Sequence, residues 1–491
     1  MKFALSLFAT ILALGWHSPA VAEPYRDIER AELARAYDTN LAALLDGTPA
    51  VAARAALAIG RTKDGAGVNA VRARLASDAP GVRAMCAYSL GLLVDAGSLG
   101  TMRRLARNDA NSAVRYAAID AVGRIILARP EFATQAVAND TIIVARTDGD
   151  PIVRAHAAAQ LDAFHSPLIA KSLAPSLERA LRREPVQDVR WHIAWAIFRG
   201  YAKYVDAAFL EQALHDGNEL VRVEAARAWG RRTDRNAGAV VKTALDDPSW
   251  RVQFEAREAL RRIAKLPPTD HLISEPPGMH LPPIVPVRSG TPVATAAAAS
   301  SGATPLPPPS SGKLAAPSAA TLPLMEPGLP MRASDLDGPG GGPHPRVRIA
   351  TTKGDVVVRL FPEWASSTVA NFLELTRRRY FDGNRWFRIV PDFVVQTGDP
   401  SDNGEGDAGY MIPAEENPLE QRSGALAMGL NYDTNGAQRD SAGTQFYIAL
   451  SPQLHLDRDF SVVGEVASGF DVLAHLVESD RMLTVRRITD G

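Results

Sequence analysis

The chain of 491 residues contains a single cysteine, Cys86. One thiol excludes a disulfide-stapled scaffold and a zinc site built from cysteines, and we expect Cys86 to pack as a small core side chain. The chain also lacks an excess of either charge, since 54 Lys and Arg stand against 55 Asp and Glu. This balance argues against nucleic acid as a partner. After the first 22 residues, no uncharged apolar run reaches the ~18 residues typical of a membrane span.

The first 22 residues have the pattern of a secretory signal peptide. Lys2 supplies a positive charge, residues 3–16 are apolar, and residues 20–22 (Ala-Val-Ala) match the small-x-small cleavage pattern. We expect cleavage before Glu23 and an exported protein, which is periplasmic in a bacterium with two membranes. A membrane anchor is the alternative, but about 14 apolar residues are short for a bilayer span.

Residues 23–265 repeat a phrase in which Val-Arg leads an alanine-rich helix. Successive valines stand 31, 32, 39, 36, 32 and 31 residues apart, a period typical of stacked helix pairs. Arginine follows the valine at Val82, Val114, Val153, Val189 and Val221, and degenerate copies of the phrase stand at Val51-Ala52 and Val252-Gln253. The pattern resembles HEAT-like repeats, and the resemblance implies an all-α solenoid.

A single helix pair cannot bury its apolar face, so the units are expected to stack. The arginine at one fixed place in the repeat is expected to make a structural contact between units, and Trp191, Trp195 and Trp229 are expected in the core. Asp150 and Asp247, each followed by proline, are predicted N-caps of helices. The concave surface is expected to bind a partner protein, with a passive spacer as the alternative.

Residues 266–345 hold 19 of the 35 prolines. Proline at this density removes amide donors and blocks helices and central strands. We predict an extended Pro/Ala/Gly-rich linker between two folded parts. A polyproline ligand for a partner is the alternative.

The two folded parts carry opposite net charges. Residues 23–265 have 35 basic and 29 acidic side chains, a net charge of +6, whereas residues 346–491 have 15 and 21, a net charge of −6. The two parts could attract one another or divide a client's surface between them. Independent drift of the two surfaces explains the difference about equally well.

From residue 347 the hydrophobic period changes to two, as in Val347, Ile349, Val356 and Val358. Helices are predicted over residues 366–380 and near residues 470–478. Many short strands with two helices predict a closed barrel capped at its ends.

Four segments in this part are recognisable together. They are residues 386–399 (WFRIVPDFVVQTGD), 409–415 (GYMIPAE), 443–448 (GTQFYI) and 463–466 (VGEV). Their order and spacing resemble the cyclophilin family over residues 346–491. The resemblance implies a mainly-β, eight-stranded antiparallel barrel with two capping helices. It also implies peptidyl-prolyl cis-trans isomerase activity without a metal or cofactor.

By this resemblance Arg388 and Gln396 are the catalytic residues, and Gln396 orients the substrate backbone. The substrate-binding residues that it implies are Phe393, Val394, Met428, Gln445, Tyr447, His455, Leu456 and Phe460. The chemistry agrees with this assignment, because the barrier of ~18–20 kcal/mol comes from amide resonance and no covalent bond changes. A fixed arginine can donate to the prolyl nitrogen, whose lone pair is freed when the amide twists.

The chain departs from the family pattern at several positions. Phe387 stands where histidine is usual, Gly429 and Leu430 replace a residue pair with a polar side chain, and residues 430–442 form a longer loop. Residues 404–409 read G-x-G-x-x-G, but a dinucleotide site requires a helix after this motif. The following segment, Tyr410 to Pro413, is not a helix start.

The leading hypothesis is an exported isomerase that acts on X-Pro bonds of client proteins. Its HEAT-like half would bind the client or another protein. The alternatives are a non-catalytic scaffold for proline peptides in envelope protein assembly, and a repeat scaffold in which isomerisation is incidental.

Overall fold

The computed structural model describes residues 19–164, 166–266, 344–433 and 436–488. Residues 1–18 of the predicted signal peptide and residues 267–343 of the predicted linker lie outside this part. The first described helix, α2 (Pro19–Ala34), runs past the predicted cleavage position before Glu23. No helix in the described ranges has the length and apolar character needed to cross a membrane.

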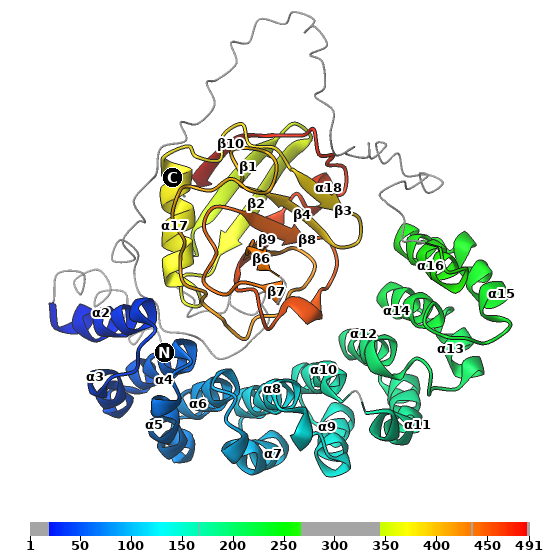
Figure 1. The fold of residues 1–491 in the computed structure, drawn as a ribbon, viewed down its shortest axis with the longest axis horizontal. Coiled ribbons are helices and arrows are strands. Elements are labelled where there is room, and N and C mark those ends of the chain that lie inside the picture. The colour runs from blue at the N-terminus through cyan, green and yellow to red at the C-terminus, as the bar shows by residue number, and fades with distance from the viewer. Residues whose placement is uncertain (1–18, 165, 267–343, 434–435, 489–491) are drawn as a thin grey trace, which may run out of the picture.

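The N-terminal part is a succession of helix pairs in two layers, which form an arc that runs from left to right in Figure 1. The inner layer faces the C-terminal part and consists of α4 (Pro49–Thr62), α6 (Pro80–Leu92), α8 (Ser112–Ala128), α10 (Pro151–Gln160), α12 (Gln187–Ala196), α14 (Glu219–Trp229) and α16 (Trp250–Ile263). The outer layer consists of α3 (Thr39–Ala43), α5 (Val68–Ala73), α7 (Leu99–Asn108), α9 (Gln135–Thr147), α11 (Pro167–Arg183), α13 (Ala207–Ala213) and α15 (Ala237–Lys242). The predicted all-α solenoid is confirmed.

The repeated arginines join neighbouring units, as predicted. Each donates its guanidinium to the carboxylate at the end of the next outer helix. The pairs are Arg83–Asp109 at 2.9 Å, Arg115–Asp148 at 2.7 Å, Arg154–Glu184 at 2.9 Å, Arg222–Asp247 at 2.7 Å, and Arg190–Asp216. These arginines hold the repeats together.

The two predicted N-caps differ in outcome. Asp150 caps α10, since its side chain accepts the N–H of Ile152. The prediction for Asp247 is wrong, because α16 begins at Trp250 after the N-cap Ser249. The Asp247 carboxylate instead accepts the N–H of Ser249 at 2.8 Å and pairs with Arg222.

The solenoid core contains the three predicted tryptophans and Cys86, all of them buried. Small residues let the inner helices pack closely. A Cβ added at Gly60 would lie 2.8 Å from the Cα of Ser89 on the next inner helix, a distance that real Cβ atoms do not tolerate. The Ser89 hydroxyl uses this proximity to donate to the Ala56 carbonyl at 2.7 Å.

The C-terminal part is an eight-stranded antiparallel sheet that curls into a barrel, so the predicted fold class is confirmed. The strand order is β10-β1-β2-β9-β5-β8-β4-β3. The strands are β1 (Arg346–Thr351), β2 (Gly354–Leu360), β3 (Arg388–Val390), β4 (Val394–Thr397), β5 (Ala425–Met428), β8 (Phe446–Ala449), β9 (Val462–Ser468) and β10 (Met482–Ile488). An antiparallel bridge between Arg385 and Arg481 connects the two ends of this order.

Two helices accompany the barrel, and both are shorter than predicted. α17 (Ser366–Arg377) ends before Arg379, which adopts a φ of 59° that an α-helix cannot continue. α18 spans Phe470–Leu473. The long loop after β5 contains a small hairpin of β6 (Tyr432–Asp433) and β7 (Gly436–Ala437); the two turn residues, 434 and 435, lie outside the described residues.

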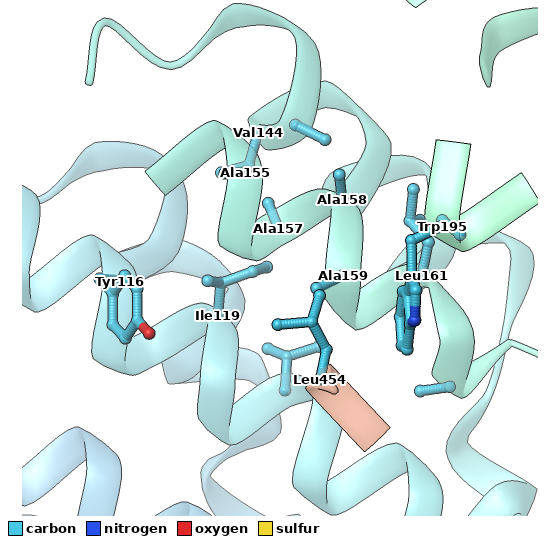
Figure 2. Packing of buried hydrophobic residues seen from close by; sticks show 14 of the residues in the cluster. Tyr116, Ile119, Val144, Ala155, Ala157, Ala158, Ala159, Leu161, Trp195 and Leu454 are labelled. Carbon is cyan, nitrogen blue, oxygen red and sulfur yellow. The ribbon is translucent and has the colours of Figure 1, made fainter. Parts of the chain in front are cut away.

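The barrel lies within the concave face of the solenoid (Figure 1). Its side chains join the same buried apolar cluster as the inner helices. The barrel members of this cluster are Phe361, Trp364, Leu419, Ala425, Ala449, Leu454 and Val462. Figure 2 shows Leu454 beside Ala159 of α10. The concave surface expected to bind a partner protein therefore contacts the chain's own barrel, and a protein partner elsewhere on the solenoid stays a prediction.

At the N-terminal end of this interface, a buried arginine donates to barrel backbone. Arg61 is 1% exposed, and its guanidinium reaches the carbonyls of Trp364 at 2.6 Å and Glu416 at 2.9 Å. In return, Arg439 of the barrel donates to the Arg61 carbonyl at 2.6 Å. Because buried polar groups require partners, these bonds fix the barrel against α4.

In the middle of the interface, Glu420 of the barrel enters a charged cluster. Its carboxylate lies 2.6 Å from Arg422, 3.3 Å from His156 Nδ1 and 3.6 Å from His192 Nε2. Arg422 also pairs with Asp188 of the solenoid at 2.9 Å. Burial alone would raise the pKa of Glu420, but the positive charge of Arg422 and the hydrogen bond from His156 outweigh burial and hold the pKa well below its ordinary value.

His156 gives this interface a pH dependence. Burial alone lowers its pKa, but its hydrogen bonds to Asp120 and Glu420 outweigh burial and raise the pKa from 6.5 to about 9. A raised pKa stabilises the fold fully below 6.5 and less as pH rises through 9. We expect urea unfolding to show a loss of roughly 3 kcal/mol across this window. His156→Gln should flatten this loss, and His215→Gln, at an exposed position, should keep it. An unchanged slope in His156→Gln would contradict the assignment.

Candidate functional site

Four neighbouring strands place a row of side chains on one outer face of the barrel. Antiparallel register pairs Arg388 on β3 with Gln396 on β4, Gln396 with Tyr447 on β8, and Tyr447 with Ala427 on β5. Directly paired residues point to the same side of a sheet. The candidate site therefore runs across the sheet from β3 to β5, and each side chain is fixed by the ladder.

A chain of hydrogen bonds connects the polar members of the site. Arg388 Nη1 donates to Gln396 Oε1 at 3.2 Å, and Gln396 Nε2 donates to Gln445 Oε1 at 3.1 Å. Gln445 Nε2 in turn donates to the carbonyls of Gly404 at 2.8 Å and Gly406 at 3.2 Å. The structure thus brings the predicted residues Arg388, Gln396 and Gln445 together as one row anchored to a loop.

Arg388 is the exposed cation of this row. Partial burial lowers the pKa of Arg388, and the neighbouring Tyr432 and Tyr447 oppose this shift. A guanidinium remains charged at neutral pH despite such a shift. The guanidinium carbon of Arg388 lies 5.5 Å from the centre of the Phe393 ring. The ring therefore helps to hold the cation over the site.

An apolar cluster lies beside the polar row. Its buried members are Val394, Ala427, Tyr447, Leu456 and Phe460, and Phe393, Leu430 and Ala437 pack against them. The rings of Tyr447 and Phe460 meet edge to face at 5.7 Å. The Tyr447 hydroxyl donates a hydrogen bond to Gln421 Oε1 at 3.1 Å. The polar atom that Tyr447 brings into this apolar cluster thus has a partner.

Met428 is a predicted substrate-binding residue that the structure places on the other side of the sheet from this cluster. It follows Ala427 on β5, and successive side chains on a strand point to opposite faces. Ala427 faces the apolar cluster, so Met428 packs inside the barrel with the core.

His455 stands next to the site as a neutral ring. It stacks on Phe393 with ring centres 6.0 Å apart and an angle of 13° between the planes. Desolvation, followed by the positive charges of Arg199 and Arg227 in the solenoid, lowers the pKa of His455 from 6.5 to about 4. The solenoid thus lies close enough to the site to act on it electrostatically.

Tyr432 at this site was missed from the sequence, and Gly429 was identified there only as the loss of a polar side chain. Tyr432 is 66% exposed, and its ring lies 6.3 Å from that of Phe460. Gly429 provides space, because a Cβ there would lie 3.1 Å from Gln396 Nε2 and 3.2 Å from Gln445 Cβ. The signals were the longer loop over residues 430–442 and the replacement of a polar pair by Gly429 and Leu430.

The loop with the G-x-G-x-x-G pattern is a support for the site. Asp399 accepts the N–H groups of Ser401 at 2.7 Å and Asn403 at 2.9 Å, which closes residues 399–404 into a tight turn. No helix follows, since residues 405–411 have no regular secondary structure. The carbonyls of Gly404 and Gly406 in this loop accept hydrogen bonds from Gln445.

Comparisons with known proteins match two different families to the two folded parts of the chain. The family described as cyclophilin type peptidyl-prolyl cis-trans isomerase matches residues 346–489, and the family of HEAT repeats matches residues 37–123 and 207–274. A peptidyl-prolyl cis-trans isomerase of Synechococcus elongatus is 35% identical over 145 residues, which are 29% of this chain and 96% of that protein.

Two further proteins are similar to part of this chain. Peptidyl-prolyl cis-trans isomerase B of Bacillus subtilis is 39% identical over 129 residues, which are 26% of this chain and 86% of that protein. A crystal structure of a cyclophilin type isomerase of Cryptosporidium parvum is 24% identical, covers 30% of this chain and 99% of that chain, and has a TM-score of 0.28.

Proposed function

This chain belongs to the cyclophilin-type peptidyl-prolyl cis-trans isomerases, and from that premise we propose that Arg388 catalyses isomerisation of X-Pro bonds in exported client proteins. The supporting observation is the row from Arg388 through Gln396 to Gln445, which runs alongside an apolar cluster. Such a pairing of a fixed cation with an apolar wall suits a proline ring attached to a polar backbone.

The proposed mechanism uses binding energy alone. Val394, Tyr447 and the other apolar residues receive the proline ring, while Gln396 holds the neighbouring backbone. Twisting the X-Pro amide breaks its resonance and frees the lone pair of the prolyl nitrogen. Arg388 then donates to that nitrogen and so binds the twisted amide better than the planar one, which accelerates the exchange.

The experiment is an isomerisation assay of the full chain with an X-Pro tetrapeptide. The proposal expects the cis-to-trans rate to rise in proportion to protein concentration. Binding of the peptide without any increase in rate would instead favour the non-catalytic scaffold.

The proposed site of action is outside the cytoplasm, in the periplasm of a bacterium with two membranes. The signal-peptide pattern of residues 1–22 supports it, and residues of α2 beyond Glu23 contact the rest of the chain. Glu32, for example, pairs with Arg61 at 3.0 Å. Cleavage before Glu23 would leave this pair intact.

Export can be tested directly by expressing the protein in a bacterium with two membranes. We expect a C-terminally tagged chain to leave the cytoplasm and to begin at Glu23, as determined by N-terminal sequencing. A matched chain lacking residues 3–16 should stay in the cytoplasm. Full-length protein that keeps Met1 in the cytoplasmic fraction would contradict export.

The HEAT-like half is proposed to add contacts to the client beside the site. The positive charges of Arg199 and Arg227 act on His455 at the edge of the apolar cluster. A peptide that leaves the cluster past His455 would therefore meet the solenoid surface.

A further inference from the structure

We propose that the solenoid positions the wall of the proline site: Arg227 on α14 and Arg251 on α16 hold Asp392, and through it Phe393. The inference rests on the proposed function of the site around Arg388. It makes Arg227 and Arg251 positioning residues, since neither touches the row of polar side chains or the apolar cluster.

Asp392 lies in the turn between β3 and β4 and is 3% exposed. Its carboxylate accepts Arg227 Nη2 at 2.9 Å and Arg251 Nε at 3.1 Å. Asp392 also has a φ of 54°, in the left-handed region that costs a residue with a side chain roughly 1 kcal/mol. The contacts with the solenoid hold this conformation.

The backbone of the same turn is fixed from a second direction. The Asp392 carbonyl accepts the Ser451 hydroxyl at 2.5 Å and Gln453 Nε2 at 3.1 Å. Arg251 Nη2 donates to the Leu450 carbonyl at 3.2 Å. One solenoid side chain thus binds both the β3–β4 turn and the segment after β8.

The consequence for the site follows from chain order. Phe393 comes directly after Asp392, and its carbonyl accepts the N–H of Leu450 at 2.8 Å. The Phe393 ring lies 5.5 Å from the guanidinium carbon of Arg388 and stacks on the His455 ring at 6.0 Å. A displacement of Asp392 would therefore move the ring that flanks the catalytic cation.

The charges around Asp392 allow this contact to be removed without unfolding the chain. Arg227 also pairs with Glu224 at 2.9 Å and Glu255 at 2.8 Å, and Arg251 pairs with Glu219 at 3.4 Å. Burial, opposed by Arg227, raises the pKa of Asp392 to about 6. When an arginine is lost, the carboxyl group can take up a proton and so avoid a buried, unpaired charge.

The test is Arg251→Ala in the full chain, with folding checked by circular dichroism. We expect KM for an X-Pro tetrapeptide to rise about fivefold while kcat stays within about twofold, because Phe393 contributes binding that the planar and twisted amides share. Arg222→Ala is the matched control. It removes an ion pair of α14 that stays within the solenoid, with Asp247 at 2.7 Å, and should leave KM unchanged.

A double-mutant cycle shows whether Arg251 acts through Asp392. Asp392→Gly removes the carboxylate and suits the positive φ, so Arg251→Ala should cause no further rise of KM in that background. An unchanged KM in folded Arg251→Ala would overturn the inference, as would an equal rise in the Asp392→Gly background. An inactive wild-type chain would overturn the proposed function instead.

Discussion

Arg388→Ala is expected to lower kcat for isomerisation by about a hundredfold and to change KM much less, because it removes a donor that acts only on the twisted amide. The row of hydrogen bonds keeps Gln396 and Gln445 in place without it, since Gln445 is held by the carbonyls of Gly404 and Gly406. Steady-state kinetics with an X-Pro tetrapeptide measures both constants.

Two variants bracket this result. Arg388→Lys keeps the charge but loses the planar fork, and we expect an intermediate kcat. Arg385→Ala is the matched control, because Arg385 precedes β3 and pairs with Asp402 at 3.8 Å away from the apolar cluster. Wild-type kcat in Arg388→Ala, or an equal loss in both alanine variants, would contradict the assigned role.

Glu420→Gln is expected to destabilise the chain by about 3 kcal/mol, since removal of one partner from a buried ion pair leaves the other charges uncompensated. The Glu420 side chain is 8% exposed and faces Arg422, His156 and His192 together. Glutamine keeps the shape and removes only the charge. Urea unfolding at neutral pH, followed by tryptophan fluorescence, measures the loss.

The control for this variant is a carboxylate that pairs on the open surface. Glu374 on α17 pairs with Arg377 at 2.7 Å and Arg378 at 2.6 Å, with no residue of the solenoid involved. Glu374→Gln should cost less than about 1 kcal/mol. Equal losses in the two variants would show that the Glu420 cluster contributes no more than a surface pair.

The solenoid could be predicted because its signals repeat. A valine recurs at one place in each unit and an arginine follows it in five of the seven, so Arg83 and Arg115 were expected to have equivalent partners, and they have them in Asp109 and Asp148. Asp247 shows the limit of such local reasoning. It was predicted as an N-cap, but the tertiary pairing with Arg222 and a turn at Ser249 use its carboxylate instead.

The sequence predicts which residues belong to the candidate site more readily than it predicts how they are arranged. A motif names Arg388 and Gln396, and strand register then places them side by side. The motif did not separate Ala427 from Met428, which alternation sends to opposite faces. Tyr432 lies on a loop without a counterpart in the motif, so only the structure shows its approach to Phe460.

The docking of the two parts was left open by the sequence for a physical reason. Much of the interface is made of backbone carbonyls, such as those of Trp364 and Glu416 that accept from Arg61. Every residue has a carbonyl, so these acceptors leave no pattern in the sequence. The opposite net charges of the two parts are consistent with their contact, but they do not specify which groups form it.

The packing of the barrel against the concave face of the solenoid is tested most directly by cutting the predicted linker. A protease recognition sequence inserted between Ser310 and Ser311 allows the folded chain to be cleaved, and size-exclusion chromatography at micromolar concentration then compares it with the intact protein. The contacts of Arg61, Glu420 and Asp392 predict that the two halves elute together at the mass of the intact chain. Elution of the halves as two separate species would contradict the docked arrangement.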